Sequence, residues 1–294
     1  MIFRQKPGII GWIILAMVIG CVFPKPEWEN VESDHEPTLN VFGLISLDEE
    51  TISFVDVHRT LTLDEQASST WGIDFESEYI VKDASVKIFD GSKQFSFTFM
   101  PWEGEYEKND RRSYQNRYYD TTGTFIPKPN MLYQLSVTTE KWGILTGEVV
   151  TPNIPTINEK AFPDTIRAKI PYTMKFDLGG EVYGKISTRV IDGYYCGIEF
   201  SRIVSPGTTE WTTPPNDCLE SERWQGVLLE GDSLEIILRT MDDQYYEYII
   251  KESAGGFVDF LTGSGGIARS IGVEGGYGVF GAIAADRIYR PLIP

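Results

Sequence analysis

Histidine, cysteine and basic residues are scarce in this chain of 294 residues, and each shortage narrows the range of possible functions. The two histidines are His35 and His58, so a histidine-rich metal site or a histidine-based catalytic triad has almost nothing to draw on. Lysine and arginine number 26 against 43 acidic residues, and the resulting net charge of −17 repels the phosphates of nucleic acid. We therefore expect no nucleic-acid partner, no metal and no cofactor.

The N-terminal apolar run, Ile9–Gly20, is shorter than the roughly 20 apolar residues that a membrane-spanning helix needs. Arg4 and Lys6 precede it and Cys21 follows directly, an arrangement that resembles a bacterial lipoprotein signal. The resemblance implies that residues 1–20 are cleaved off and that Cys21 carries a diacylglycerol, which anchors the chain in membrane lipid. The alternative is an uncleaved membrane helix with an incidental cysteine. Residues 21–36, rich in proline and acid, predict an extended, solvated tether.

Two cysteines remain after Cys21, namely Cys196 and Cys218. An even pair in an exported protein favours a disulfide between them, because the compartments outside the cytoplasm are oxidising. Two unrelated buried thiols are the alternative. The chain has no Cys-x-x-Cys spacing, so neither a thiol redox motif nor a zinc knuckle is indicated.

Strand signals dominate residues 37–152. In Lys93–Met100, for example, Phe95, Phe97 and Phe99 alternate with polar residues, and Asp90-Gly91 just before it is a strong hairpin signal. The expected strands are Thr38–Leu47, Thr51–Thr60, Tyr79–Asp90, Lys93–Met100, Met131–Thr138 and Trp142–Val150. About seven short strands joined by turns predict an all-β, mainly antiparallel domain, an Ig-like or transthyretin-like β-sandwich. Thr151–Pro155, with two prolines, is expected to be a linker.

Residues 153–294 predict a second β-rich domain with one short helix. Its expected strands are Thr165–Pro171, Thr173–Leu178, Lys185–Ile191, Tyr194–Ile203, Ser233–Thr240 and a closing strand at Tyr277–Tyr289. Asp242 can cap a helix that begins at Asp243 and ends before Gly255. Helical spacing would place Tyr245, Tyr248, Ile249 and Glu252 on one face of that helix.

Several blocks together resemble a large family of bacterial lipoproteins of unknown function. They are Cys21 with its tether, Tyr79–Asp90 and the phenylalanine-rich run after it, Tyr119–Gly123, Pro127–Val137, Thr151–Pro155 and Gly275–Ala282. The resemblance implies an Ig-like or carboxypeptidase-regulatory-like N-terminal sandwich, an outer-membrane location, and a TonB-dependent β-barrel receptor as partner. The family supplies no catalytic residues to carry over, and its implied role rests on fold-level analogy.

Two aromatic-rich stretches, Pro101–Asp120 and Tyr194–Trp224, are candidate binding loops. The candidate residues are Trp102, Tyr106, Tyr118, Tyr119, Tyr194, Tyr195, Trp211 and Trp224. Flat rings beside polar groups can stack on sugars or anchor a protein partner. For Pro101–Asp120 the alternative is a long β-hairpin with half-buried tyrosines.

Other motifs give no catalytic constellation. Gly263–Ala268 matches G-x-G-x-x-A but lacks the βαβ setting of a dinucleotide site, so it predicts a tight-turning loop. Asp242 and Asp243 suit a helix cap better than an acid–base pair. We therefore expect a non-enzymatic, lipid-anchored accessory of a TonB-dependent receptor. A stand-alone surface module for glycan or protein, and an unrecognised hydrolase, remain as alternatives.

Overall fold

The fold follows from alternating apolar residues that bury one face of each strand. A computed structural model describes residues 36–60, 79–101, 116–167, 170–191, 200–213, 233–251 and 270–293. Its strands are β1 (Leu39–Leu47), β2 (Phe54–Arg59), β3 (Ser85–Phe89), β4 (Gln94–Met100), β5 (Arg117–Tyr119), β6 (Leu132–Thr139), β7 (Gly143–Val150), β8 (Thr156–Ile157), β9 (Ile166–Arg167), β10 (Thr173–Asp177), β11 (Tyr183–Val190), β12 (Ser201–Val204), β13 (Glu210–Thr212), β14 (Ser233–Met241), β15 (Ser270–Ile271), β16 (Val273–Glu274) and β17 (Tyr277–Ile293). Three helical segments accompany them, η1 (Glu159–Ala161), α2 (Asp243–Tyr245) and η2 (Tyr246–Lys251). The predicted all-β class is confirmed.

The hairpin of β3 and β4 illustrates how the sequence determines the local structure. Asp90 accepts hydrogen bonds from the backbone N–H groups of Ser92 (2.9 Å) and Lys93 (2.7 Å), and Gly91 adopts a positive φ of 86°. This turn sets the antiparallel register in which Ile88 lies opposite Phe95. The register places Phe95 and Phe97 in the interior, as their alternation predicts.

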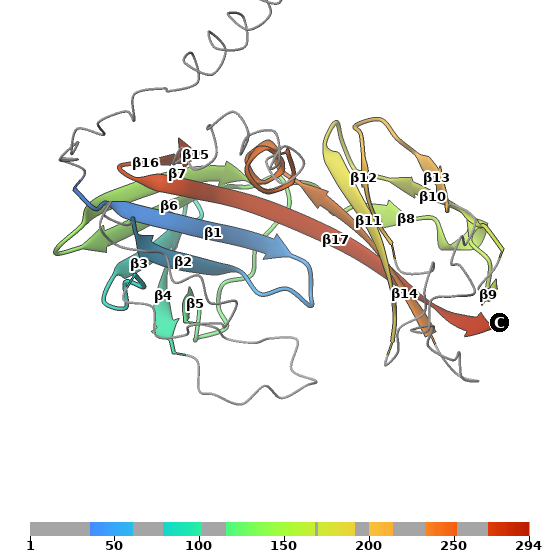
Figure 1. Cartoon of the computed structure of the whole chain (residues 1–294), viewed down its shortest axis with the longest axis horizontal. Helices are drawn as coiled ribbons and strands as arrows, with labels where there is room; N and C mark the ends of the chain where they lie inside the picture. The colour runs from blue at the N-terminus through green and yellow to red at the C-terminus, as the bar shows by residue number, and fades with distance from the viewer. Residues whose placement is uncertain are drawn as a thin grey trace, which may run out of the picture. The chain divides into compact units, whose positions relative to one another are not determined.

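Strands β1 to β7 and the first half of β17 enclose one core (Figure 1). The hydrogen-bonded order β17-β1-β2-β5-β4-β3-β6-β7-β16 folds over so that β1 and β2 face β6 and β7. Leu39, Val41, Ile45, Val57 and Leu145 are fully or almost fully buried between these layers. The described residues before position 152 thus contain the expected seven strands. The finer assignment of this half as an Ig-like or transthyretin-like sandwich stays a prediction.

The second half builds another core from β10, β11, β14 and the remainder of β17. A three-stranded sheet, β13-β10-β8, packs over the sheet β12-β11-β14-β17. Met174 and Phe176 from β10 meet Ile186 from β11 and Leu234 from β14 in this second core. The expected strands that fall within the described residues are present here, although β9 occupies only Ile166–Arg167 of its predicted range. Most of the strand expected at Tyr194–Ile203 lies outside the described residues, and β12 begins at Ser201.

β17 belongs to both cores. Its N-terminal half pairs with β1 in parallel, from Asn40 opposite Tyr277 to Leu47 opposite Ala284. Its C-terminal half pairs antiparallel with β14, from Met241 opposite Ile283 to Ser233 opposite Pro291. Figure 1 shows this strand running through both parts of the molecule. Residues 37–294 accordingly form one compact unit.

The expected linker at Thr151–Pro155 is a fixed segment between the two cores. Thr151 is buried, and its hydroxyl donates to the carbonyl of Lys128 over 2.6 Å. The carbonyl of Asn153 accepts from the hydroxyl of Thr240 on β14 over 2.9 Å. These bonds satisfy polar groups that would otherwise be lost from water, so the segment is packed rather than solvated.

The helix forms where it was predicted, but it presents a different face. Asp242 caps it, as expected, by accepting from the backbone N–H groups of Gln244 and Tyr245. Tyr245, Tyr246 and Ile250 pack against the neighbouring sheets, rather than the predicted set with Tyr248 and Ile249. The reason is the π-helical turn η2, whose wider i→i+5 spacing brings Ile250 to the same side as Tyr245.

A network of ion pairs fixes the turn after β1 against the second half. Asp48, only 1% exposed, pairs with Arg239 of β14 (3.0 Å) and with Arg287 of β17. Arg287 also pairs with Glu50 (2.7 Å) and with the fully buried Glu235 (3.1 Å). Burial opposes ionisation of Asp48, but the Glu50 amide and the two arginines outweigh it, so its pKa lies below the ordinary value.

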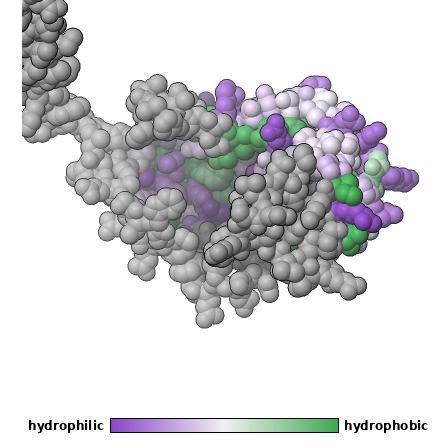
Figure 2. Space-filling view, turned by 45° about the vertical axis from the view of Figure 1, so that its right-hand side comes forward, coloured by the Kyte–Doolittle hydropathy of each residue, from purple (hydrophilic) through white to green (hydrophobic). Residues whose placement is uncertain are grey.

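The exterior is uneven in hydropathy. The face shown in Figure 2 carries a hydrophobic strip with hydrophilic groups beside it and toward its outer margin. Among the residues that the structure describes, we find no helix with the length and apolar character needed to span a membrane.

Candidate functional site

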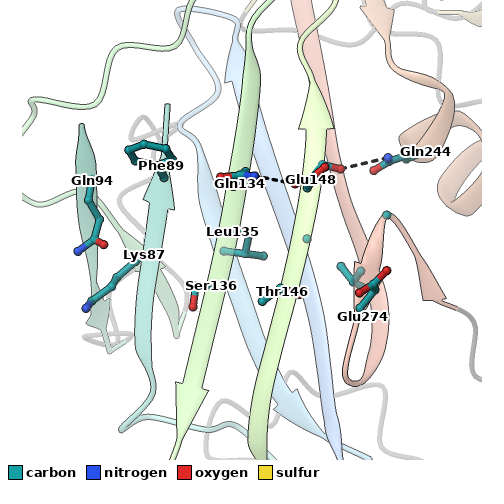
Figure 3. A pocket seen from close by; sticks show the side chains of 13 residues that line it. Lys87, Phe89, Gln94, Gln134, Leu135, Ser136, Thr146, Glu148, Gln244 and Glu274 are labelled. Carbon is teal, nitrogen blue, oxygen red and sulfur yellow. Dashed lines mark hydrogen bonds between the residues drawn. The ribbon is translucent and has the colours of Figure 1, made fainter. Parts of the chain in front are cut away.

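A groove of about 730 Å³ with a defined polar lining lies on the outer face of the first sheet. Strands β3, β4, β6, β7 and β16 supply most of its lining, and the helix supplies one wall (Figure 3). Leu135, Gly147 and Val273 form its floor and are buried. The face exists because alternate residues of these strands point away from the core.

The strand register arranges the side chains of this groove in two rows. The amide row runs Gln94, Phe89, Gln134, Glu148 across β4, β3, β6 and β7. The charged row runs Lys87, Ser136, Thr146, Glu274 across β3, β6, β7 and β16. Figure 3 shows the two rows one above the other on the same face.

Hydrogen bonds join part of the amide row and connect it to the helix. The side-chain amide of Gln134 donates to the carboxylate of Glu148 over 2.6 Å. The amide of Gln244, at the wall, donates to the backbone carbonyl of Glu148 over 3.1 Å. Phe89 is 37% exposed, which gives the groove an apolar surface beside these amides. Polar groups in fixed positions next to an apolar surface are typical of a binding site.

The charged row has opposite charges at its two ends. Within the described part of the chain, neither the ammonium group of Lys87 nor the carboxylate of Glu274 has an ion-pair or hydrogen-bond partner. The hydroxyls of Ser136 and Thr146 lie between them in the register. A ligand in the groove would thus meet a cation at one end, an anion at the other, and hydroxyl groups between.

Asp242 fixes the wall of the groove. Its carboxylate accepts from the backbone N–H of Gln244 (2.9 Å), of Tyr245 (3.4 Å) and of Ala282 on β17 (2.6 Å). Burial raises the pKa of Asp242 to about 6, and these three donors only partly oppose that effect. The expected reading of Asp242 and Asp243 as a helix cap is confirmed.

The raised pKa of Asp242 predicts that the stability of the folded protein depends on pH. The pKa of Asp242 rises from 3.8 to about 6 on folding, so the folded state binds the proton more tightly. Its contribution to stability is therefore present below about pH 4 and is lost as pH rises toward 6. Relative to wild type, Asp242→Asn should gain about 3 kcal/mol of unfolding free energy between pH 4 and 7. Urea unfolding of both proteins across that pH range measures this gain. A free-energy difference that does not change with pH would contradict the raised pKa of Asp242.

Gly272 allows the wall to approach β7. It has a φ of +68°, and a Cβ built there would lie 1.8 Å from Oε1 of Gln244. Gly272→Ala should therefore displace Gln244 from Glu148 and lower stability by about 2 kcal/mol. Thermal unfolding measures the loss. Gly123→Ala is the control, because its φ is also positive, at +66°, but nothing lies within 4 Å, so only the backbone strain should remain.

Three of the aromatic residues expected to form binding loops pack against other side chains in the structure. Tyr118 is a core residue, 1% exposed, and its hydroxyl donates to the carbonyl of Val81 (2.7 Å) and accepts from the N–H of Ala84 (2.9 Å). Tyr119, 4% exposed, packs in another core cluster beside Phe54, with ring centroids 6.3 Å apart. Trp211 is half-buried against Phe200, with ring centroids 4.5 Å apart. Three aromatic residues thus serve packing rather than an exposed loop surface.

The other expected site residues lie outside the described part of the chain. They are Cys21, Trp102, Tyr106, Tyr194, Tyr195, Cys196, Cys218 and Trp224. Lipid attachment at Cys21, the disulfide and the remaining loop aromatics stay predictions.

His58 lies on β2 beside a second pair of charged residues. Arg117 pairs with Asp56 (2.8 Å) and lies over the ring of Phe54 (4.1 Å). Burial and the nearby Arg117 both lower the pKa of His58, whereas burial raises the pKa of Asp56 to about 6. Among the described residues, no group of three or more histidine, cysteine or acidic side chains is placed to hold a metal ion.

Fold and groove together define the class: an all-β protein with a polar groove on one sheet face. The chain belongs to the family described as a domain of unknown function (DUF4249), whose model matches residues 28–288. No curated protein matches the chain. The resemblance to an uncharacterised family is thereby confirmed, while the lipoprotein character and the receptor partner stay predictions.

Proposed function

We propose that this chain is a lipid-anchored, non-catalytic binding protein of the outer membrane that captures a polar ligand beside a TonB-dependent receptor. The groove carries the binding part of this proposal, because it presents polar groups in fixed rows around one exposed ring, Phe89. Cys21 after a short apolar run supports the anchor. The acidic tether, residues 21–36, would let the binding body stand away from the bilayer.

The anchor and the partner can be tested in one membrane experiment. The full-length chain, tagged at its C-terminus, is cross-linked in native membranes from a photoreactive residue placed at Ser136 in the groove. We expect recovery of a TonB-dependent barrel in near-equal amount. The control places the same residue at Lys160, which lies on the second half of the chain outside this groove. A parallel Cys21→Ser variant should leave the membrane fraction.

The alternatives predict different results. If the chain is recovered without a barrel, yet is lipidated and open to external protease, it is a stand-alone surface-binding module. If Cys21→Ser stays in the membrane, the anchor is not a lipid. Turnover of a substrate panel by the purified protein would instead favour a hydrolase.

A further inference from the structure

The charged row of the groove distinguishes the two ends of a ligand. Lys87 on β3 and Glu274 on β16 are separated by β6 and β7, which supply Ser136 and Thr146 between them. Neighbouring strands lie about 4.8 Å apart, so three spacings place the two backbone positions roughly 14 Å from each other. This separation is too great for the two side chains to satisfy each other directly, so each charge remains available to a ligand.

The separation also limits the length of that ligand. An extended peptide covers about 3.3–3.6 Å per residue, so three residues span roughly 10 Å. The long side chains of Lys87 and Glu274 can cover the remaining distance from either end. A chain of this length has a carboxylate at one end and an ammonium group at the other, which matches the two charges in the row.

The rest of the groove suits a peptide backbone. Hydroxyls of Ser136 and Thr146 can donate to and accept from peptide groups lying across the strands. The exposed amide of Gln94 offers further partners, and Phe89 provides an apolar surface for a ligand side chain. From the end charges, their spacing and this lining, we infer that the groove binds a short zwitterionic peptide, with its carboxylate at Lys87 and its amino terminus at Glu274. This inference rests on the proposed function only in taking the groove as the ligand site.

The test uses tri-alanine and two analogues, one acetylated at its amino end and one amidated at its carboxyl end. Calorimetric titration of the purified full-length chain should show tri-alanine binding about tenfold tighter than either analogue, because each analogue loses one charged contact. Lys87→Gln should weaken tri-alanine about tenfold but leave the amidated analogue unchanged. Glu274→Gln should do the same for tri-alanine and leave the acetylated analogue unchanged.

Exchange of the two charges provides a stricter test. In the double variant Lys87→Glu with Glu274→Lys, tri-alanine can bind in the reverse direction, so its affinity should recover to within about threefold of wild type. Lys141→Gln and Glu181→Gln, which change exposed charges outside the groove, should leave all affinities unchanged. Their folding, and that of the groove variants, is checked by thermal unfolding.

The outcomes separate the inference from the proposed function. Equal affinity for all three peptides, or no peptide binding, would overturn the inference. Binding of a neutral trisaccharide such as maltotriose, weakened by Phe89→Ala and not by Lys87→Gln, would overturn it while keeping a ligand-binding groove. Failure to cross-link a barrel would overturn the proposed receptor partnership without touching the peptide result.

Discussion

Replacing Arg287 by methionine should lower the free energy of unfolding by about 3 kcal/mol at neutral pH. The arginine contacts three carboxylates, Asp48, Glu50 and Glu235, and two of these are 1% exposed or less. Methionine fills a similar volume but leaves these buried negative charges close together with only Arg239 and Arg189 to balance them. Such a loss of one partner costs more than the intact network contributes, because desolvated charge is left unpaired.

Denaturant unfolding at several pH values tests this expectation. The deficit should shrink toward pH 4, where protonation removes the charge that methionine leaves uncompensated. Lys251→Met is the matched control, because its pair with Glu247 is 63% and 43% exposed. Exposed pairs of this kind contribute little, so the control should unfold almost as wild type does. Equal losses in the two variants would contradict a buried, coupled network.

A single methyl group at Gly278 should have an effect of similar size. Gly278 adopts a φ of +113°, and a Cβ built there would lie 1.9 Å from the carbonyl oxygen of Val41. That oxygen belongs to the backbone of β1, opposite Gly278 in the parallel pairing with β17. Gly278→Ala should therefore separate the two strands locally and cost about 3 kcal/mol.

Thermal unfolding measures the loss at Gly278, and amide hydrogen exchange locates it. Protection should fall first along β1 and the N-terminal half of β17. Gly180→Ala is the control, because Gly180 does not have a positive φ and has open space around it. A destabilisation shared equally by both variants would show that close strand contact is not the cause.

The features that the sequence predicts correctly are those that local chemistry determines. The alternating phenylalanines of Lys93–Met100 gave β4 to within one residue, and the Asp90-Gly91 turn gave its hairpin. Asp242 was a sound helix cap because its own side chain supplies the missing hydrogen bonds. Each of these features depends on residues a few positions apart.

The features that the sequence does not predict depend on partners far away along the chain. Tyr118 and Tyr119 looked like loop aromatics, yet the hydroxyl of Tyr118 finds partners near residue 81 and its ring enters the core. Asp48, in the turn after β1, is buried because its partners Arg239 and Arg287 come from strands near the other end of the chain. The groove could not be predicted, because the alignment of Lys87 with Glu274 depends on the register of four strands.

The shared strand β17 determines when folding can finish. Both cores stay open until β17 is in place, and it emerges after every other described strand has been made. A chain that lacks its final strand would expose apolar surface in both halves, and such long-range pairing is slow to form. In the exported lipoprotein that we propose, both cores would therefore stay incomplete until β17 had crossed the membrane.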